Sequence, residues 1–214
     1  MDKNSYFKRV SYFIMGIFFY LNYLFPVNEK KILLIMTHDD SDEGNVGSTY
    51  RYFQQRDPDL IFKKVTRENF TFKLNKTQLK NIFYMFIIVP HHISTSKTIF
   101  MDNIFLPFSS IKIKNDTRLV QLWHGTGTIK KFGLDTEVGW IKKLGIATNK
   151  NTTHFIVGSN WMKQIYKTAF QAEEDRIFNI GCPRTDFFFN KHTLEEKRNK
   201  FIDNNPELFN KKII

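Results

Sequence analysis

Short apolar runs recur along this 214-residue chain, and polar or helix-forming stretches separate each run from the next. The first run, Lys31–Met36, has charge before it and turn-forming residues after it, a pattern typical of a buried strand. The same pattern predicts further strands at Leu60–Val65, Lys97–Met101, Leu119–Leu122, Thr153–Val157 and Arg176–Ile180. Strands that alternate with helices form parallel sheets, so we expect a parallel α/β fold.

Helical signals lie between these runs. Helices are expected at residues 48–55, within 76–101 (beside one or two strands), at 159–170 and at 193–204. Ser159 and Asn160 favour a helix start because their side chains can accept from free backbone N–H groups. No internal repeat or low-complexity linker is visible, so one domain with a sizeable core is expected.

The amino-acid composition limits the classes of partner that this chain is expected to bind. With 42% hydrophobic and 16% aromatic residues, the chain is not a disordered protein. Its 32 Lys+Arg against 21 Asp+Glu give a net charge of +11, which predicts an anionic partner: nucleic acid, an acidic membrane or a phosphorylated substrate. An AT-rich genome would also enrich Lys and accounts for part of this charge. No nucleic-acid-binding signature is evident, so no nucleic-acid partner is expected.

Cys182 is the only cysteine, so no disulfide can form within the chain, which fits a reducing cytoplasm. It lies inside Gly181-Cys-Pro183, where a nucleophile is conceivable. The favoured interpretation is a small residue that fills a tight turn.

Residues 6–25 hold nine aromatic side chains, and the uncharged run within them, 10–25, is sixteen residues long. A spanning helix needs about twenty apolar residues, and no small-residue cleavage site follows, so neither a span nor a signal peptide fits. We expect an amphipathic interfacial helix in residues 1–28, ended by Pro26. A helix packed on the protein's own core is the alternative. The basic residues expected to attract anionic lipid are Lys3, Lys8, Arg9, Lys30 and Lys31.

The strongest chemical signal is the segment 121–131, in which a strand leads into His124, then glycines and hydroxyls, then Lys130 and Lys131. Open α/β sheets bind ligands at strand ends, glycine lets backbone approach an anion, and lysine neutralises negative charge. This order suits phosphate transfer with neutral imidazole as the base. A lone histidine is also often a structural residue, and from these residues alone the two interpretations weigh equally.

The same segment resembles the Trp-His-Gly-Thr…Lys-Lys-x-Gly signature of the CDP-glycerol glycerophosphotransferases, which build teichoic acids. A second stretch, Gly181–Asp186, resembles that family's Gly-x-Pro-Arg-x-Asp element, in the same order and at roughly the same spacing. The resemblance covers the family's first half. It implies a Rossmann-like parallel sheet that forms the N-terminal, acceptor half of a GT-B-type fold.

The resemblance also implies residue roles. His124 would be the general base, taking a proton from an acceptor hydroxyl as that hydroxyl attacks the β-phosphorus side of a CDP-alcohol. Substrate contacts are implied for Trp123, Gly125, Thr126, Gly127, Lys130, Lys131, Arg184 and Asp186. For Arg184 and Asp186, the slightly favoured interpretation is structural: the two side chains pair with each other and hold their loop. Gly44 and Asn45, after the first strand, are further candidates for contact with the acceptor.

No cofactor and no metal site are expected. Asp40-Ser-Asp42 imitates the metal-binding Asp-x-Asp of another glycosyltransferase class, but so short a motif is common by chance. A calcium loop starting at Asp39 would place Tyr50 where a glutamate ligand is required, which excludes an EF-hand.

The resemblance implies a primase-like enzyme, because Gly127-Thr-Ile129 precedes the lysine pair where many polymerising members have Pro-Leu. Such an enzyme transfers glycerol phosphate from CDP-glycerol to an undecaprenyl-diphosphate-linked disaccharide, as a peripheral protein on the cytoplasmic face of the bacterial membrane. The expected domains are an interfacial helix (1–28), an acceptor domain (29–210) and the start of a nucleotide-binding domain (211–214). Alternatives are a polyglycerol- or ribitol-phosphate polymerase, a non-catalytic membrane-binding module, and a metal-dependent sugar transferase.

Overall fold

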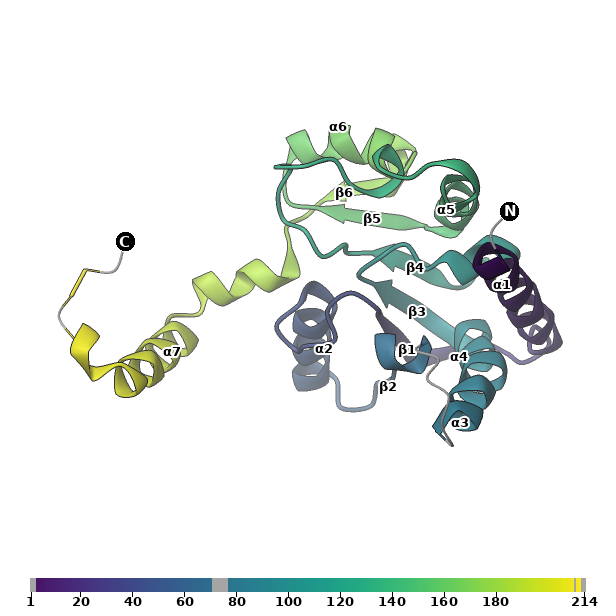
Figure 1. Ribbon diagram of the computed structural model, residues 1–214. Coiled ribbons are helices and arrows are strands. Elements are labelled where there is room, and N and C mark those ends of the chain that lie inside the picture. The colour runs from purple at the N-terminus through teal and green to yellow at the C-terminus, as the bar shows by residue number, and fades with distance from the viewer. Residues whose placement is uncertain (1–2, 71–76, 210, 213–214) are drawn as a thin grey trace.

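The computed structural model describes residues 3–70, 77–209 and 211–212, and within them the predicted parallel α/β sheet is confirmed. Six strands lie in the order β2-β1-β3-β4-β5-β6, and every neighbouring pair is parallel (Figure 1). The strands are β1 (Asn28–Met36), β2 (Ile61–Thr66), β3 (Ser96–Met101), β4 (Arg118–Gln121), β5 (His154–Val157) and β6 (Ile177–Asn179). Each predicted strand is present, because buried apolar runs are a local property of the sequence.

The helices mostly follow the predicted pattern. They are α1 (Lys3–Leu21), α2 (Asn45–Arg56), α3 (Thr77–Phe83), α4 (Val89–Thr95), α5 (Gly139–Asn151), α6 (Asn160–Ala169) and α7 (Lys191–Asn204). Ser159 caps α6 as predicted, since its Oγ accepts from the N–H of Met162 at 3.2 Å. The helix α5 was not predicted, and it begins at a glycine with φ of +60°.

The two faces of the sheet are covered unequally. Strand pairing places Leu33, Ile99 and Leu119 side by side, and α1 and α4 pack on this face. Phe155 of β5 lies on the same face and packs against α6. The opposite face is covered by α2, whose Val46 packs on a cluster of buried strand residues. Figure 1 shows α2 apart from the α1 and α4 side of the sheet.

The strand order creates a point where ligands bind in such folds. The chain leaves β1 toward α2 on one face, whereas it leaves β3 toward the 3-10 helix Leu106–Ser110, whose Phe108 is buried on the other face. Folds in which two such connections diverge bind ligands at the carboxyl ends of these adjacent strands.

The N-terminal helix exists, but its predicted end was wrong. It ends at Leu21, because the Asn22 side chain donates to the Phe18 carbonyl at 2.8 Å and the Asn22 carbonyl accepts from Ser94 at 2.7 Å. Met15 and Phe19 are buried against the core, so the core-packing alternative holds for one side of the helix. In the described part of the chain, no helix is both long and apolar enough to cross a bilayer.

The C-terminal segment leads away from the sheet. The 3-10 helix η6 (Pro183–Phe189) follows β6, and α7 then extends outward with no buried side chain (Figure 1). The domain start predicted at 211–214 falls partly on residues 213–214, which lie outside the described residues.

Candidate active site

Three strand ends bring together a histidine pair and a carboxylate. His38 follows β1, Asp102 follows β3, and His124 lies three positions after the end of β4. The Nδ1 atom of His124 lies 2.9 Å from the Asp102 backbone carbonyl, and the rings of His38 and His124 stack. Because a carbonyl oxygen can only accept, Nδ1 carries the proton and Nε2 keeps its lone pair.

The surroundings keep His124 neutral. Burial lowers the pKa of its imidazole, and the hydrogen bond to Asp102 opposes that shift. The nearby charges of His38, Lys130 and Arg184 lower the pKa further. A neutral imidazole among cationic side chains can accept a proton while an anionic group is bound beside it.

Asp102, which the sequence analysis did not single out, orders both histidines. Its side chain is buried, and its carboxylate accepts from the backbone N–H groups of Thr37 at 3.0 Å, His38 at 3.1 Å and Asp39 at 2.9 Å. Burial raises the pKa of this carboxyl, and the three backbone donors oppose the shift. Asp102 therefore holds the His38 loop with its side chain and His124 with its main chain.

Trp123 adopts a backbone conformation that is unusual for a bulky residue, with φ of +56°. Two buried amides hold it there: Gln121 Oε1 accepts from the Trp123 N–H at 2.9 Å, and Asn45 Nδ2 donates to the Trp123 carbonyl at 2.8 Å. The indole is buried and stacks on Phe132. Strain of this kind persists only where neighbours over-determine it, and here it directs the residue that follows, His124.

Asn45 connects the two sequence motifs. Its Oδ1 accepts from the Cys182 thiol at 3.0 Å and from the Arg184 N–H at 3.2 Å, on the far side from Trp123. The guanidinium of Arg184 then donates to the His124 carbonyl at 3.0 Å. Burial raises the pKa of the Cys182 thiol, which disfavours the thiolate needed for nucleophilic attack. These contacts support the interpretation of Cys182 as a packing residue.

Gly44 and Asn45 are both buried, so the structure does not place them at the surface of the site. A Cβ atom at Gly44 would lie 2.7 Å from Asp39 Oδ2, a distance too short for real contacts. Close packing within the loop after β1 accounts for this glycine.

The loop after His124 faces solvent. Thr126, Gly127, Lys130 and Lys131 are exposed, and Gly125 is half-buried. Of the two lysines, Lys130 is the one whose charge acts on His124. Because Lys130 is exposed, a ligand can reach the loop beside the His124 imidazole.

Arg184 and Asp186 are both exposed, and no ion pair joins them within the described ranges. Nor does any group of three or more His, Cys, Asp or Glu side chains there have the arrangement to hold a metal ion. Asp42 instead pairs with Lys64 at 3.4 Å.

His38, Asp102 and Gln121 were missed by the sequence analysis. A usable signal was present: Asp102 directly follows a predicted strand and His38 lies two positions after another, where parallel sheets place their sites. That these strands are neighbours became visible only in the sheet order.

Comparison with known proteins was informative. A family model described as CDP-glycerol:poly(glycerophosphate) glycerophosphotransferase matches residues 17–207. The teichoic acid ribitol-phosphate primase of Bacillus spizizenii is 26% identical over 201 residues, covering 90% of this chain and 50% of that protein. The teichoic acid glycerol-phosphate primase of Bacillus subtilis is 24% identical over 217 residues, covering 89% and 53%.

Among solved structures, a variant of the wall teichoic acid polymerase TagF superimposes with a TM-score of 0.66 at 16% identity, covering 95% of this chain and 54% of that chain. Another TagF structure, from a crystal soaked with CDPG, also gives a TM-score of 0.66, at 15% identity and covering 91% and 48%. These matches show a shared fold. The chain spans about half the length of the curated relatives it matches.

Proposed function

Because the chain belongs to the CDP-glycerol:poly(glycerophosphate) glycerophosphotransferase family, we propose that it is the acceptor-binding part of a teichoic acid glycerophosphotransferase. The reaction moves glycerol phosphate from CDP-glycerol to an undecaprenyl-diphosphate-linked saccharide. The observation that carries the proposal is the neutral His124 imidazole, oriented by Asp102 at the carboxyl ends of the strands and surrounded by cationic side chains.

His124 acts as the general base in this proposal. An acceptor hydroxyl attacks the β-phosphorus of the donor, and Nε2 takes the hydroxyl proton. The new bond joins the acceptor oxygen to that phosphorus, and the bond from phosphorus to the oxygen shared with CMP breaks. CMP leaves with the electron pair. Lys130 and Arg184 offset the phosphate charge beside the imidazole.

The sequence favours the primase branch, as the residues before Lys130 differ from the Pro-Leu of many polymerising members. Relatives named as primases and as a ribitol-phosphate polymerase match this chain at 24–26% identity. A glycerol- or ribitol-phosphate polymerase is therefore the alternative within the family. Product length and parallel assays with CDP-glycerol and CDP-ribitol separate these activities.

We further propose three parts: a segment at 1–28 that contains α1 and touches the membrane, an acceptor domain at 29–210, and residues from 211 onward that begin a donor-binding domain. The donor's nucleotide would contact mainly that further domain. Residues 1–214 alone are thus expected to be inactive, and transfer of glycerol phosphate by them would overturn this expectation.

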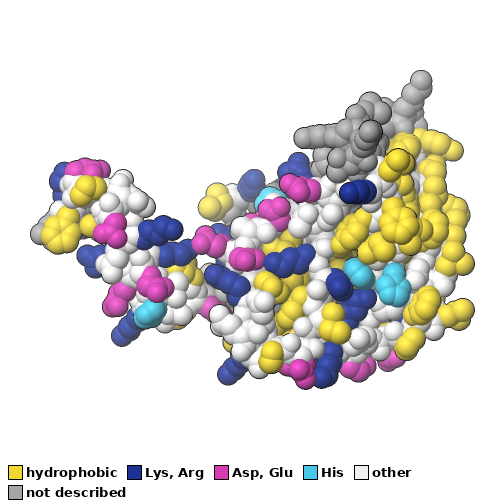
Figure 2. Space-filling view, turned by 90° about the horizontal axis from the view of Figure 1, so that it is seen from below, with side chains coloured by type: hydrophobic (Ala, Val, Ile, Leu, Met, Phe, Trp, Pro, Cys, Tyr) yellow, Lys and Arg dark blue, Asp and Glu magenta, His cyan; other side chains and the backbone are white. Residues whose placement is uncertain are grey.

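The membrane contact is supported by exposed apolar side chains on and after α1. Figure 2 shows hydrophobic side chains gathered on the side of the molecule that carries α1. The exposed members of this surface are Tyr6, Phe7, Phe13, Ile14, Ile17, Tyr20, Leu21, Tyr23, Leu24 and Phe25. Exposed aromatic and aliphatic side chains near lysines suit peripheral binding to anionic lipid at the cytoplasmic face.

The test is transfer by the complete gene product with CDP-glycerol and a lipid-diphosphate disaccharide. His124→Ala should lower the rate about a hundred- to ten-thousandfold, because the proton acceptor is lost. His192→Ala, which alters an exposed histidine on α7, should leave the rate unchanged. Undiminished activity of His124→Ala would remove this residue from the mechanism. Liposome binding without transfer from any CDP-alcohol would instead favour a non-catalytic membrane-binding module.

A further inference from the structure

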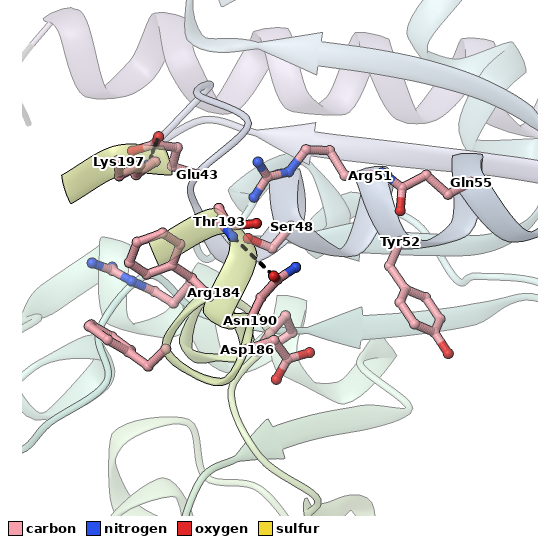
Figure 3. Close-up of a pocket in the computed structure, with 13 residues that line it drawn as sticks. Glu43, Ser48, Arg51, Tyr52, Gln55, Arg184, Asp186, Asn190, Thr193 and Lys197 are labelled. Carbon is pink, nitrogen blue, oxygen red and sulfur yellow. Dashed lines mark hydrogen bonds and ion pairs between the residues drawn. The ribbon is translucent and has the colours of Figure 1, made fainter. Parts of the chain in front are cut away.

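A pocket of about 410 Å³ lies between α2 and the segment formed by η6 and the start of α7. Figure 3 shows Ser48, Arg51 and Gln55 along α2, with Arg184 and Asn190 on the segment across from them. None of these side chains except that of Arg184 was identified from the sequence. The pocket is adjacent to the candidate active site, because Arg184 lines it and also donates to the His124 carbonyl.

The pocket has an excess of positive charge. Its lining contains the cations Arg51, Arg184 and Lys197 and the carboxylates Glu43 and Asp186. Lys197 pairs with Glu43, and this hydrogen bond is the main reason that the pKa of Glu43 is lowered. The Arg51 guanidinium makes no hydrogen bond or ion pair among the described residues, and its charge adds to the lowering of the Glu43 pKa. Two guanidinium groups on opposite walls thus remain available to an anion.

Guanidinium groups are suited to phosphate because their N–H groups match two phosphate oxygens at once. The arginine of α2 is exposed, so it keeps this capacity without the cost of releasing an internal partner. Arg184 uses one nitrogen on the His124 carbonyl and retains its other donors. An anion held by Arg184 would therefore be bound by a residue that also contacts the main chain of His124.

The rest of the lining fits a polyhydroxy compound. Ser48, Gln55 and Thr193 supply hydroxyl and amide groups, which bind sugar or polyol hydroxyls in both directions. Tyr52 and Phe188 are exposed aromatic side chains at the same pocket, and flat rings pack against the C–H faces of such compounds. A phosphate ester of a sugar or polyol meets both requirements.

We propose that this pocket binds the phosphate-bearing saccharide or polyol portion of the acceptor, with Arg51 and Arg184 on the phosphate. The inference rests on the proposed function, since it takes the acceptor to lie beside His124. It assigns acceptor recognition to α2 and η6, two elements that are far apart in sequence and that face each other across the pocket (Figure 3).

Binding to the 214-residue chain is the first test, with glycerol 3-phosphate as the probe and calorimetry as the measurement. Arg51→Gln should weaken binding about tenfold or more, because one charged hydrogen-bonding group is lost. Arg118→Gln removes the same charge from an exposed site at the start of β4, the opposite end of the sheet, and should leave binding unchanged. Equal weakening by both variants would overturn the proposal, since it would show a general charge effect.

Two further probes define the ligand class. Glycerol without phosphate should bind much more weakly than glycerol 3-phosphate. If inorganic phosphate bound as tightly as glycerol 3-phosphate, the polyol part of the proposal would be overturned. If CMP bound with the same dependence on Arg51, the pocket would belong to the donor instead.

Kinetics of the complete gene product separate this inference from the proposed function. Arg51→Gln should raise the KM for the acceptor about tenfold and leave the KM for CDP-glycerol unchanged. Normal wild-type transfer with an unchanged acceptor KM in the variant would sink the pocket assignment and leave the function intact. Absence of wild-type transfer with any CDP-alcohol would sink the function, while Arg51-dependent binding of glycerol 3-phosphate would still support a phosphate-ester site.

Discussion

The imidazole rings of His38 and His124 stack with their centroids 3.5 Å apart and their planes 29° from parallel. The first ring follows β1 and the second follows β4. Asp102, which follows the strand between them, β3, holds both residues by hydrogen bonds. His38 thus covers one face of the candidate base. Its removal would admit water to that face and would also remove a neighbouring group that carries positive charge when protonated.

We therefore predict that His38→Ala raises the pKa of His124. Burial is the main cause of the lowered pKa, and the charge of His38 is a further cause, so both effects act in the same direction. His38→Phe should give a smaller rise, because it keeps the ring that shields His124. NMR titration of the histidine ring signals measures the pKa of His124 in wild type and in both variants. Identical His124 titration in wild type and His38→Ala would show that the stacking has no electrostatic consequence.

Asp102→Ala should lower the free energy of unfolding by about 2–4 kcal/mol, since three backbone N–H groups in the loop after β1 lose their acceptor. Urea denaturation followed by circular dichroism measures the change. Asp203→Ala removes an exposed carboxylate on α7 and should stay within about 0.5 kcal/mol of wild type. Equal stability of the two variants would mean that the Asp102 hydrogen bonds are replaced by water at no cost.

Two glycines beside the site should respond differently to alanine. Gly133 has φ of +59°, and a Cβ there would lie 2.4 Å from the Ala169 carbonyl oxygen, so Gly133→Ala should destabilise by about 2 kcal/mol or more. At Gly127 a Cβ meets nothing within 4 Å, so Gly127→Ala should change stability by less than about 0.5 kcal/mol. Thermal or urea unfolding measures the stability of both variants relative to wild type.

Gly127→Ala also tests ligand approach, because a stable variant with impaired transfer in the complete protein would place phosphate against this backbone. Unimpaired transfer would mean that no ligand comes close to Gly127. A Gly133→Ala protein as stable as wild type would contradict the packing described for that turn.

The stability of the chain should fall as the pH is lowered from about 6.5 toward about 4, because of His92. Burial and the charges of Lys31, Lys63 and His91 lower the pKa of His92 to about 4, whereas an unfolded histidine titrates near 6.5. The unfolded state takes up the proton first, so stability that is present above pH 6.5 is lost through this window. Partial exposure of the ring limits the loss to about 1–2 kcal/mol.

His92→Asn should flatten this pH dependence when urea denaturation at pH 7.5 is compared with that at pH 5. His192→Asn, on an exposed part of α7, should keep the wild-type slope. An unchanged slope in His92→Asn would assign the acid sensitivity to other groups.

Some elements followed from local signals and others did not. β1 was located because six consecutive residues, Lys31–Met36, are buried in the sheet. The helix α5 was missed because two glycines, Gly139 and Gly145, weaken its local signal; Gly145 is needed for close packing, since a Cβ there would lie 2.6 Å from Leu134. The end of α1 was misplaced because Asn22 stops the helix through a contact with α4.

The candidate site likewise contains residues that the sequence identified and contacts that only the structure revealed. His124, Lys130 and Arg184 were identified from the sequence because their motifs are continuous. The contacts of Asn45 became visible only in the structure: its buried amide, which hydrogen-bonds groups of residues 122, 123, 182 and 184, joins the two motifs. A contact between residues more than seventy positions apart has no signature in a single sequence.

The sequence by itself determined the strands, most of the helices, the charge and the two motifs, because apolar periodicity, capping and short motifs are properties of neighbouring residues. The tertiary structure alone decided that His38, Asp102 and His124 share one edge and that Arg51 and Arg184 line one pocket. Those relationships depend on the order of strands in the sheet and on the path of the chain after β6. Both are set by the packing of the whole domain, which local preferences leave open.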